Sequence, residues 1–217
     1  MKYIIASDAA EAWKLALKLV LENGKDFVDY DGRICREVLN MGIEIRNPKD
    51  SIAKPIGILS NLGIGAYPLI DEVIETLFRK DNPGVYDYCY GPRIFNYHGV
   101  DQIHNYIIPL LKTNPNSRRA VISLWDPTED SKVDRRNVVS WMVSDFKIRE
   151  NKLNLTFYGR SIDLFIGWPV NVYQQYILME KVAREVNVGI GSLTTMISSA
   201  HIFLEYGDKI NRVLRMR

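Results

Sequence analysis

The sequence predicts an α+β fold in which helices cover one large β-sheet. A helical pattern begins the chain, strand-like segments cluster in its middle, and another helical pattern ends it, without the regular alternation of a doubly wound fold. The 217 residues, of which 47% are hydrophobic, are enough to bury a substantial core. We therefore expect a single domain over residues 1–217.

The first part of the chain predicts two helices separated by a strand and a long loop. Ser7 or Asp8 can cap a helix that runs to about residue 21 and is closed by a glycine. Residues 38–45 form a predicted strand and residues 71–79 a second helix. Between them, residues 48–68 are rich in Gly, Pro and Ser, which indicates a loop that is a candidate for substrate contacts.

The next segment alternates between aromatic and polar residues before a turn. This alternation, over residues 85–92, would place Tyr86, Tyr88 and Tyr90 on one side of a strand. A helix over residues 100–112 follows, and Pro109 should kink or shorten it because proline has no backbone donor.

The second half contains most of the predicted sheet. The expected elements are strands at 120–125, 138–148, 153–158 and 193–202, a surface loop at 126–137, and helices at 169–186 and 203–214. Ser140 falls inside an apolar strand and has no Gly-x-Ser-x-Gly context, which by itself indicates a small core residue.

Charge and cysteine content argue against several functional classes. The 28 basic and 26 acidic residues give a formal net charge of +2 and are interspersed, so we expect no binding to nucleic acid or to a membrane surface. Cys35 and Cys89 are too few for a disulfide framework, and no Cys/His grouping has metal-ligand spacing, so we expect no metal. The N-terminus lacks the apolar core of a signal peptide and no apolar stretch is long enough to span a membrane, which predicts a cytoplasmic location.

Two groups of basic residues are candidates for an anion site. Arg118 and Arg119 lie in a turn between a helix and a strand, and Arg160 precedes Ser161 at a predicted junction between a strand and a helix. Arginine suits bidentate phosphate binding because its guanidinium is planar. An isolated Arg-Arg pair is more often a solvated turn, but the second group favours an anion site. Arg46, at the end of a predicted strand, is a further substrate-binding candidate.

Asn171, Asp163 and His201 are candidates for recognising the remaining parts of a nucleotide. Asn171 lies early in a helix, and its carboxamide can pair with the N3 donor and O4 acceptor of uracil, whereas a carboxylate would suit cytosine. Asp163 can pair with Arg160 or receive a polar ring edge. His201 ends an apolar strand and can donate to a sugar hydroxyl, although a lone histidine is more often structural.

Together these segments resemble the thymidylate synthase and deoxycytidylate hydroxymethylase family. The resemblance is good from about Tyr86 to Tyr206, and its most specific part is the pattern Arg-Ser-x-Asp followed by Gly-x-Pro-x-Asn. The matching residues are Asp101-Gln102-Ile103, Asn114-Pro115-Asn116-Ser117-Arg118-Arg119, Asp145-Phe146, Arg160-Ser161-Ile162-Asp163, Gly167-Trp168-Pro169-Val170-Asn171 and Ala200-His201-Ile202.

The resemblance implies a thymidylate-synthase-like fold with a large mixed sheet, and a homodimer in which two sheets pack back to back and share active sites. Arg118 and Arg119 would reach the nucleotide phosphate of the partner, and Arg160 and Ser161 would bind the phosphate within their own subunit. Asn171 would recognise the pyrimidine.

The resemblance also implies roles around the sugar and the folate. His201 would approach the sugar, while Asp163 and Gly167 would contact 5,10-methylenetetrahydrofolate or a related pterin. Phe203 stands where the family usually has a sugar-binding tyrosine, so the choice between ribose and deoxyribose is open.

The family reaction begins when a cysteine thiolate attacks C6 of the pyrimidine and makes C5 nucleophilic toward a one-carbon unit. Ser140 occupies the position of that cysteine. Tyr88 or Tyr90 would lie near the catalytic tyrosine of the family, Glu72 is a candidate for its proton-handling glutamate, and Asp163 completes the catalytic candidates.

Three functions follow from these residues. The first is transfer of a methyl or hydroxymethyl group to C5 of dUMP or a related pyrimidine nucleoside monophosphate. Because a serine hydroxyl needs a base that a thiol does not, Ser140 also leaves open an N-glycosidic hydrolase and a nucleotide-binding protein without catalysis.

Overall fold

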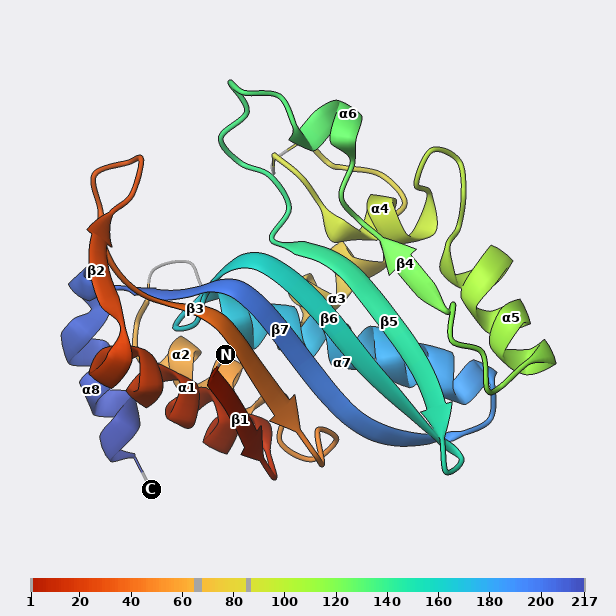
Figure 1. Ribbon diagram of the computed structural model, residues 1–217, viewed down its shortest axis with the longest axis horizontal. Coiled ribbons are helices and arrows are strands. Elements are labelled where there is room, and N and C mark those ends of the chain that lie inside the picture. The colour runs from red at the N-terminus through yellow and green to blue at the C-terminus, as the bar shows by residue number, and fades with distance from the viewer. Residues whose placement is uncertain (1, 65–67, 85–86, 217) are drawn as a thin grey trace.

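A seven-stranded sheet forms the centre of the computed structural model, which describes residues 2–64, 68–84 and 87–216 (Figure 1). Its strands are β1 (Lys2–Ala6), β2 (Lys25–Val28), β3 (Ile34–Ile45), β4 (Val121–Ser123), β5 (Trp141–Arg149), β6 (Lys152–Asp163) and β7 (Gly189–Phe203). The order is β1-β3-β7-β6-β5-β4, and β2 pairs with β3. Because β1 and β3 are parallel, as are β6 and β7, while the other pairs are antiparallel, the large mixed sheet is confirmed.

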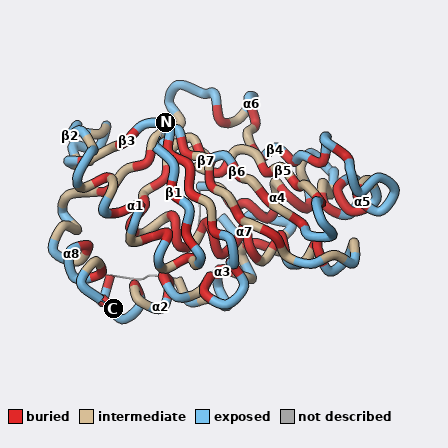
Figure 2. The backbone as a smooth tube through the Cα atoms, turned by 60° about the horizontal axis from the view of Figure 1, so that its bottom comes forward, coloured by how far each residue is buried: buried red, intermediate tan, exposed pale blue. Residues whose placement is uncertain are grey.

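Helices form a layer on one face of this sheet. The helices and helical turns are α1 (Ala9–Asn23), α2 (Lys54–Asn61), α3 (Ile70–Phe78), α4 (Tyr90–Phe95), a π-helical turn η1 (Ile103–Ile107), α5 (Ile108–Thr113), α6 (Pro127–Asp130), α7 (Gly167–Glu185), a 3-10 turn η2 (Leu204–Tyr206) and α8 (Gly207–Arg215). Helix α7 runs behind the central strands and is buried along most of its length (Figures 1 and 2). Its Trp168, Leu178 and Met179 have no exposed surface, so α7 belongs to the core. This arrangement confirms the α+β class.

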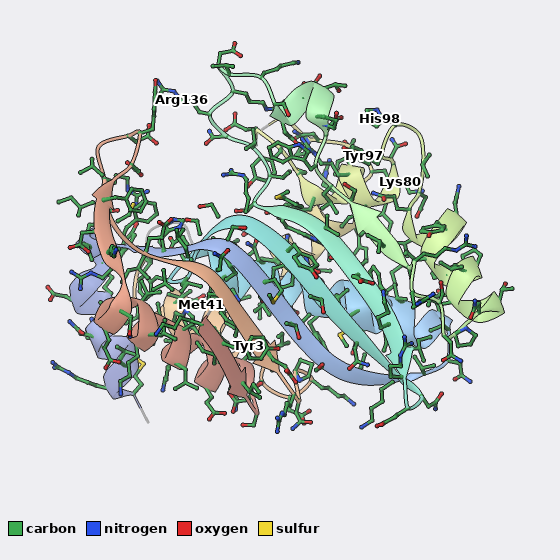
Figure 3. All side chains as sticks on the ribbon, viewed as in Figure 1. Tyr3, Met41, Lys80, Tyr97, His98 and Arg136 are labelled. Carbon is green, nitrogen blue, oxygen red and sulfur yellow. The ribbon has the colours of Figure 1, made fainter. Side chains whose placement is uncertain are left out.

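The opposite face of the sheet carries no helix over its central strands (Figure 1). Tyr3 and Tyr158 are 48% and 46% exposed, and a shallow groove of about 440 Å³ is lined in part by Met142, Tyr158 and Met196. Gly42 makes room for the Tyr3 ring (labelled in Figure 3), because a Cβ at this position would lie 2.3 Å from that ring. An exposed apolar surface of this kind is typical of a protein interface.

Helix α1 begins and ends close to where the sequence places it. Asp8 is the cap, since its carboxylate accepts from the Glu11 backbone N–H at 2.9 Å. Gly24 ends the helix, and a Cβ there would lie 2.5 Å from the Arg36 side chain and 2.6 Å from the Val20 carbonyl. The predicted strand at 38–45 is longer than expected, because β3 begins at Ile34.

The predicted loop at 48–68 is partly wrong, because it contains α2. Proline at position 55 stands in the first turn, where its missing N–H costs nothing, and so does not prevent a helix. Pro55, Ile56 and Leu59 are buried against the core, and this packing stabilises the helix. The Gly, Pro and Ser content of the segment did not indicate a helix.

The predicted strand at 85–92 is also wrong for its described residues. Residues 87–89 form no strand, and α4 begins at Tyr90; Tyr86 lies outside the described residues. A Cβ at Gly91 would lie 2.4 Å from the Arg79 carbonyl and 2.7 Å from the Leu77 carbonyl. Glycine therefore allows the first turn of α4 to pack against the end of α3, which no local pattern reveals.

The predicted helix at 100–112 is interrupted as Pro109 requires. The Ile108 N–H donates to the Ile103 carbonyl, five residues back, so the chain makes the wide turn η1 before α5 begins. Proline would clash with the carbonyl four residues earlier in a regular helix, and the wider turn relieves that clash.

The region around β5 and β6 differs from prediction at its ends. Strand β5 begins at Trp141, so Ser140 precedes the strand, and β6 continues to Asp163, so Arg160 belongs to a strand end. The predicted loop at 126–137 contains the short helix α6, whose Asp130 pairs with Arg93 of α4. Within the described residues, no helix is long and apolar enough to cross a membrane.

Candidate functional site

Strands β6 and β7 end where β3 begins, and this end of the sheet gathers a row of polar side chains. Asp163 of β6 is the register partner of His201 of β7, which is also the partner of Glu37 of β3. Two residues earlier, Ser161 is the partner of Ser199. Cross-strand partners place their Cβ atoms about 5 Å apart on one face of a sheet. Two carboxylates, an imidazole and two hydroxyls therefore lie together.

Hydrogen bonds connect these side chains. The Ser161 and Ser199 hydroxyl oxygens are 3.3 Å apart, and Ser161 Oγ lies 3.4 Å from His201 Nδ1. The Ser199 hydroxyl donates to the Glu37 carboxylate. Burial lowers the pKa of His201, although the Ser199 carbonyl and the Glu37 carboxylate oppose this, so the ring is neutral at pH 7.

Ser140 lies against the same end of β6. The Arg160 backbone N–H donates to the Ser140 carbonyl at 3.0 Å, and the Ser140 hydroxyl donates to the Ser161 carbonyl. The Arg160 guanidinium donates to the carbonyls of Val138 and Val139, both at 2.9 Å. Arg160 thus holds the segment before β5 in place, and Ser140 lies beside Ser161. The catalytic candidate and the phosphate-binding candidates are therefore neighbours.

Tyr88 and Tyr90 lie next to the residue that follows Ser140. The Tyr90 hydroxyl accepts from the Trp141 backbone N–H at 3.4 Å, and the two ring centroids are 5.0 Å apart. The Tyr88 ring centroid lies 5.6 Å from that of Tyr90. Burial raises the pKa of Tyr90, so its phenol remains a neutral donor and acceptor.

Asp163 shapes the turn that leads into α7. Its Oδ1 accepts from the backbone N–H groups of Phe165 at 2.9 Å and Ile166 at 3.4 Å. Burial raises its pKa to about 6, even though these two donors favour the carboxylate. Gly167 begins α7, and a Cβ there would meet only the Asp163 Cβ, at 3.7 Å, so the space beside Asp163 is open.

Asn171 is buried in α7, with 7% of its surface exposed. Its carboxamide has no hydrogen-bond partner among the described residues, and its amide atoms still reach solvent, since the fully buried side-chain atoms without a partner are Arg79 Nε, Gln174 Oε1 and Gln175 Nε2. One turn later, Gln175 Oε1 accepts from Ser144 at 3.0 Å, and Ser144 accepts from Trp141 Nε1 at 2.9 Å. This connection ties α7 to β5, and Asn171 is left available for a ligand.

Arg118 and Arg119 are remote from Arg160 within one chain. They precede β4, whose Val121 pairs with Asp145, and Arg160 lies four residues beyond that register on β6. Two strand spacings and four residues correspond to roughly 15 Å or more. Both arginine side chains are exposed, and neither has an ion pair or hydrogen bond to any residue that the structure describes.

Glu72 forms no hydrogen bond with this polar row among the described residues, and Arg46 lies at the other end of β3. Glu72 is exposed at the start of α3, where its carboxylate accepts from the Leu69 backbone N–H at 2.9 Å. Arg46 follows Ile45, the register partner of Leu193. His201 lies eight residues further along β7, about 26 Å away at the usual rise of a strand.

Sequence reasoning missed Glu37 and Ser199, because neither lies in a motif and only sheet register brings them together. It also missed Arg33, whose guanidinium lies 3.2 Å from the centroid of the Phe203 ring. Because these residues are far apart along the chain, no local sequence pattern indicated that they would lie together. Arg36, two residues before the strand prediction began, pairs with Asp26 and takes no part in the site.

The loop that leads to Ser140 also contacts the β2–β3 hairpin. Arg136 lies near the tip of that hairpin (Figure 3), with its guanidinium 4.6 Å from the centroid of the Tyr30 ring and 3.6 Å from Asp31 Oδ1. Two segments that are far apart in sequence therefore meet above the strand ends, one carrying Arg33 and the other preceding Ser140.

Cys35 is the thiol at this end of the sheet, since it is the register partner of Phe203. Burial raises its pKa to about 11, which leaves it protonated and a poor nucleophile at neutral pH. Among the described residues, no group of three or more His, Cys, Asp or Glu side chains could hold a metal ion.

Comparison with known proteins points to one family. A family model described as thymidylate synthase matches residues 68–217. Proteins named "Putative thymidylate synthase" from Methanococcoides burtonii and Methanosarcina barkeri are each 33% identical, over 99% of this chain and 95% of their own length. The thymidylate synthase of Mycoplasma mobile is 34% identical over 64% of this chain and 47% of its own length. The chain belongs to the thymidylate synthase family.

Proposed function

We propose that this protein binds a pyrimidine nucleoside monophosphate and transfers a one-carbon unit, methyl or hydroxymethyl, to C5 of dUMP or a related nucleotide. The observation that carries the proposal is the contact between Ser140 and Ser161. The residue at the position of the family nucleophile lies against the strand that carries the candidate phosphate-binding residues.

The proposed phosphate site consists of Arg160 and Ser161, completed by Arg118 and Arg119 of a second copy. Arg160 uses Nε and one terminal nitrogen on backbone carbonyls, and its remaining terminal nitrogen can bind an anion. The exposed and unpaired state of Arg118 and Arg119 in the described chain supports the view that their ligand lies on a partner.

A homodimer with shared active sites is therefore part of the proposal. The open sheet face with Tyr3, Tyr158 and Met196 supports back-to-back packing, because it exposes apolar surface where no helix covers the strands.

Asn171 is the proposed base-recognition residue. Asn171 is largely buried and its carboxamide has no hydrogen-bond partner in the described chain, so a uracil edge can pair with both its donor and its acceptor. His201 is proposed to approach the sugar.

Asp163 and Gly167 are proposed to contact 5,10-methylenetetrahydrofolate or a related pterin, which would supply the one-carbon unit when bound. Asp163 fits this role because its Oδ2 is not used by the turn, and because a pKa of about 6 lets the carboxyl either donate or accept near neutral pH. Gly167 leaves room beside it.

Catalysis is where Ser140 matters most. Its hydroxyl donates to a backbone carbonyl, which cannot remove a proton, and among the described residues no side-chain base hydrogen-bonds to it. Attack on C6 by this serine should therefore be slow, since an unactivated hydroxyl is a weak nucleophile.

Folate-dependent release of tritium from C5-labelled dUMP tests the proposal in the native protein and in Ser140→Cys. We expect faster release from the cysteine variant. A Ser140→Cys protein that binds dUMP and releases no tritium would contradict one-carbon transfer.

The missing base favours a second candidate, a nucleotide-binding protein without catalysis. This function predicts calorimetric binding of dUMP by the native protein, with neither tritium release nor free base from either form. Free base released without folate would instead support the N-glycosidic hydrolase.

A further inference from the structure

The polar row at the end of β3, β6 and β7 contains a chain of hydrogen bonds that begins at Glu37. Ser199 Oγ contacts Glu37 Oε1, Ser161 Oγ lies 3.3 Å from Ser199 Oγ, and His201 Nδ1 lies 3.4 Å from Ser161 Oγ. The four residues come from three strands, so sheet register maintains their order.

The direction of these hydrogen bonds follows from their starting point. The hydrogen bond between Ser199 and Glu37 runs from the Ser199 hydroxyl to a carboxylate oxygen of Glu37, which accepts. Ser199 must therefore donate its single hydroxyl proton to Glu37, and its oxygen is left to accept from Ser161. The Ser161 hydroxyl donates to Ser199, so at His201 it can only accept, which requires the proton on Nδ1.

The state of His201 completes the chain. The residue is partly buried, and because burial lowers its pKa the ring is neutral and carries one proton. When that proton is on Nδ1, Nε2 is left as a hydrogen-bond acceptor, because the hydrogen bond at one ring nitrogen determines the tautomer.

We infer that Glu37 is a positioning residue that acts through Ser199 and Ser161 to hold His201 in its Nδ1–H tautomer, so that Nε2 accepts a hydrogen bond from a hydroxyl of the ligand. The ligand part of this inference rests on the proposed function, in which His201 approaches the sugar of the nucleotide. It assigns the sugar hydroxyl the role of donor.

Long-range proton–nitrogen NMR of the ¹⁵N-histidine-labelled protein, in the free state and above pH 7, tests the tautomer directly. The chain has only three histidines, so a His201→Gln variant identifies the signals of His201. We expect a protonated Nδ1 and an unprotonated Nε2 in the native protein. A proton on Nε2 in the native protein would overturn the inference.

Two variants test whether Glu37 directs the chain. In Ser199→Ala, Ser161 loses its acceptor and can donate to His201 Nδ1, so the main tautomer should change to Nε2–H. In Glu37→Gln the carboxamide can donate to Ser199, which should also raise the Nε2–H population. An unchanged Nδ1–H tautomer in both variants would reject the role of Glu37.

Two control variants separate this role from a loss of structure. Ser199→Thr keeps the hydroxyl and should keep the Nδ1–H tautomer. Glu44→Gln removes a carboxylate at the other end of β3, where it accepts from Tyr3 at 3.0 Å, and should leave His201 unchanged. A change of tautomer in either control would count against the relay.

Calorimetry tests the ligand part separately. The native protein should bind dUMP about fivefold more tightly than 2′,3′-dideoxyuridine monophosphate, the value of one hydrogen bond, and Ser199→Ala should lose this difference. If neither nucleotide binds, the proposed function fails while the NMR result still decides the relay. If both bind equally to the native protein, the assignment of the hydroxyl as a donor to His201 is wrong.

Discussion

The Ser140 hydroxyl donates to the backbone carbonyl of Ser161 on the neighbouring strand. This contact joins the segment before β5 to the end of β6, where Arg160 makes three further hydrogen bonds to residues 138–140. Ser140, which we propose as the attacking residue, is thus also part of the local scaffold.

Replacing Ser140 with alanine should lower the free energy of unfolding by about 1 kcal/mol, the usual contribution of one hydrogen bond. Urea titration followed by circular dichroism measures this value. Ser131→Ala, at an exposed position directly after α6, is the control and should change stability by less than about 0.5 kcal/mol. Equal stability of Ser140→Ala and the native protein would show that the contact contributes nothing to folding.

Asp163 should make the folded state more stable at low pH than at neutral pH. Its pKa is about 6 in the folded protein and about 3.9 in an unfolded chain, so the folded state binds this proton more tightly. The contribution is complete below pH 4 and is lost as the pH rises to about 6, by about 2 to 3 kcal/mol in total.

The comparison that isolates this effect is between the native protein and Asp163→Asn, by urea titration from pH 4 to pH 7. The stability of the native protein relative to the variant should fall over that range. Asp208→Asn, at an exposed position, should run parallel to the native protein. A difference between Asp163→Asn and the native protein that rises with pH would show that the pKa of Asp163 is lowered instead.

The ion pair between Arg93 and Asp130 should be one of the stronger single contributions to stability. The Asp130 side chain is fully buried, and Arg93 Nη2 donates to its Oδ1 at 2.9 Å. Burial alone would raise the pKa of Asp130, but the hydrogen bonds from Arg93 outweigh it and the pKa is lowered.

Asp130→Ala leaves the Arg93 charge buried without its partner, so the free energy of unfolding should fall by about 3 to 5 kcal/mol. Removing the exposed carboxylate of the neighbouring Glu129 by Glu129→Ala should cost less than about 1 kcal/mol. Because the pKa of Asp130 is lowered, its stabilisation should be present above about pH 4 and be lost as the pH falls further. Thermal unfolding that is the same in the two variants would contradict a strong buried pair.

Asn171→Asp should change the base preference from uracil to cytosine. A carboxylate can accept from the N4 amino group of cytosine but cannot donate to O4 of uracil. We expect the ratio of affinities for dUMP and dCMP to move at least about tenfold toward dCMP, which corresponds to 1.4 kcal/mol. Calorimetric titration with both nucleotides measures the ratio.

Asn187→Asp is a matched control for that change, because it adds the same charge at an exposed position after α7. It should bind both nucleotides as the native protein does. An unchanged ratio in Asn171→Asp, together with intact binding, would remove Asn171 from base recognition.

The sequence predicted the helices that depend on local contacts. Helix α1 has a cap at Asp8, apolar residues at helical spacing and a glycine at its end, and all of these act within a few residues of one another. Helix α2 was missed because its stability comes from the burial of Pro55, Ile56 and Leu59 against distant parts of the core. The strand predicted before α4 was wrong for the same reason, namely a contact between distant parts of the chain. Only glycine fits at position 91, where the backbone of α4 packs against the end of α3.

For the site, the sequence by itself identified the residue types and motifs at Arg160, Ser161, Asp163, Asn171 and His201, because motif chemistry depends on the identity and spacing of residues. Only the tertiary structure decided which side chains meet. Glu37 and Ser199 are separated by 162 positions in the sequence, and only the register of the sheet brings them together. The local pattern of either strand does not show which residue of another strand will be its partner. The polar row exists because β3, β6 and β7 pair with their ends aligned, which is a property of the folded chain as a whole.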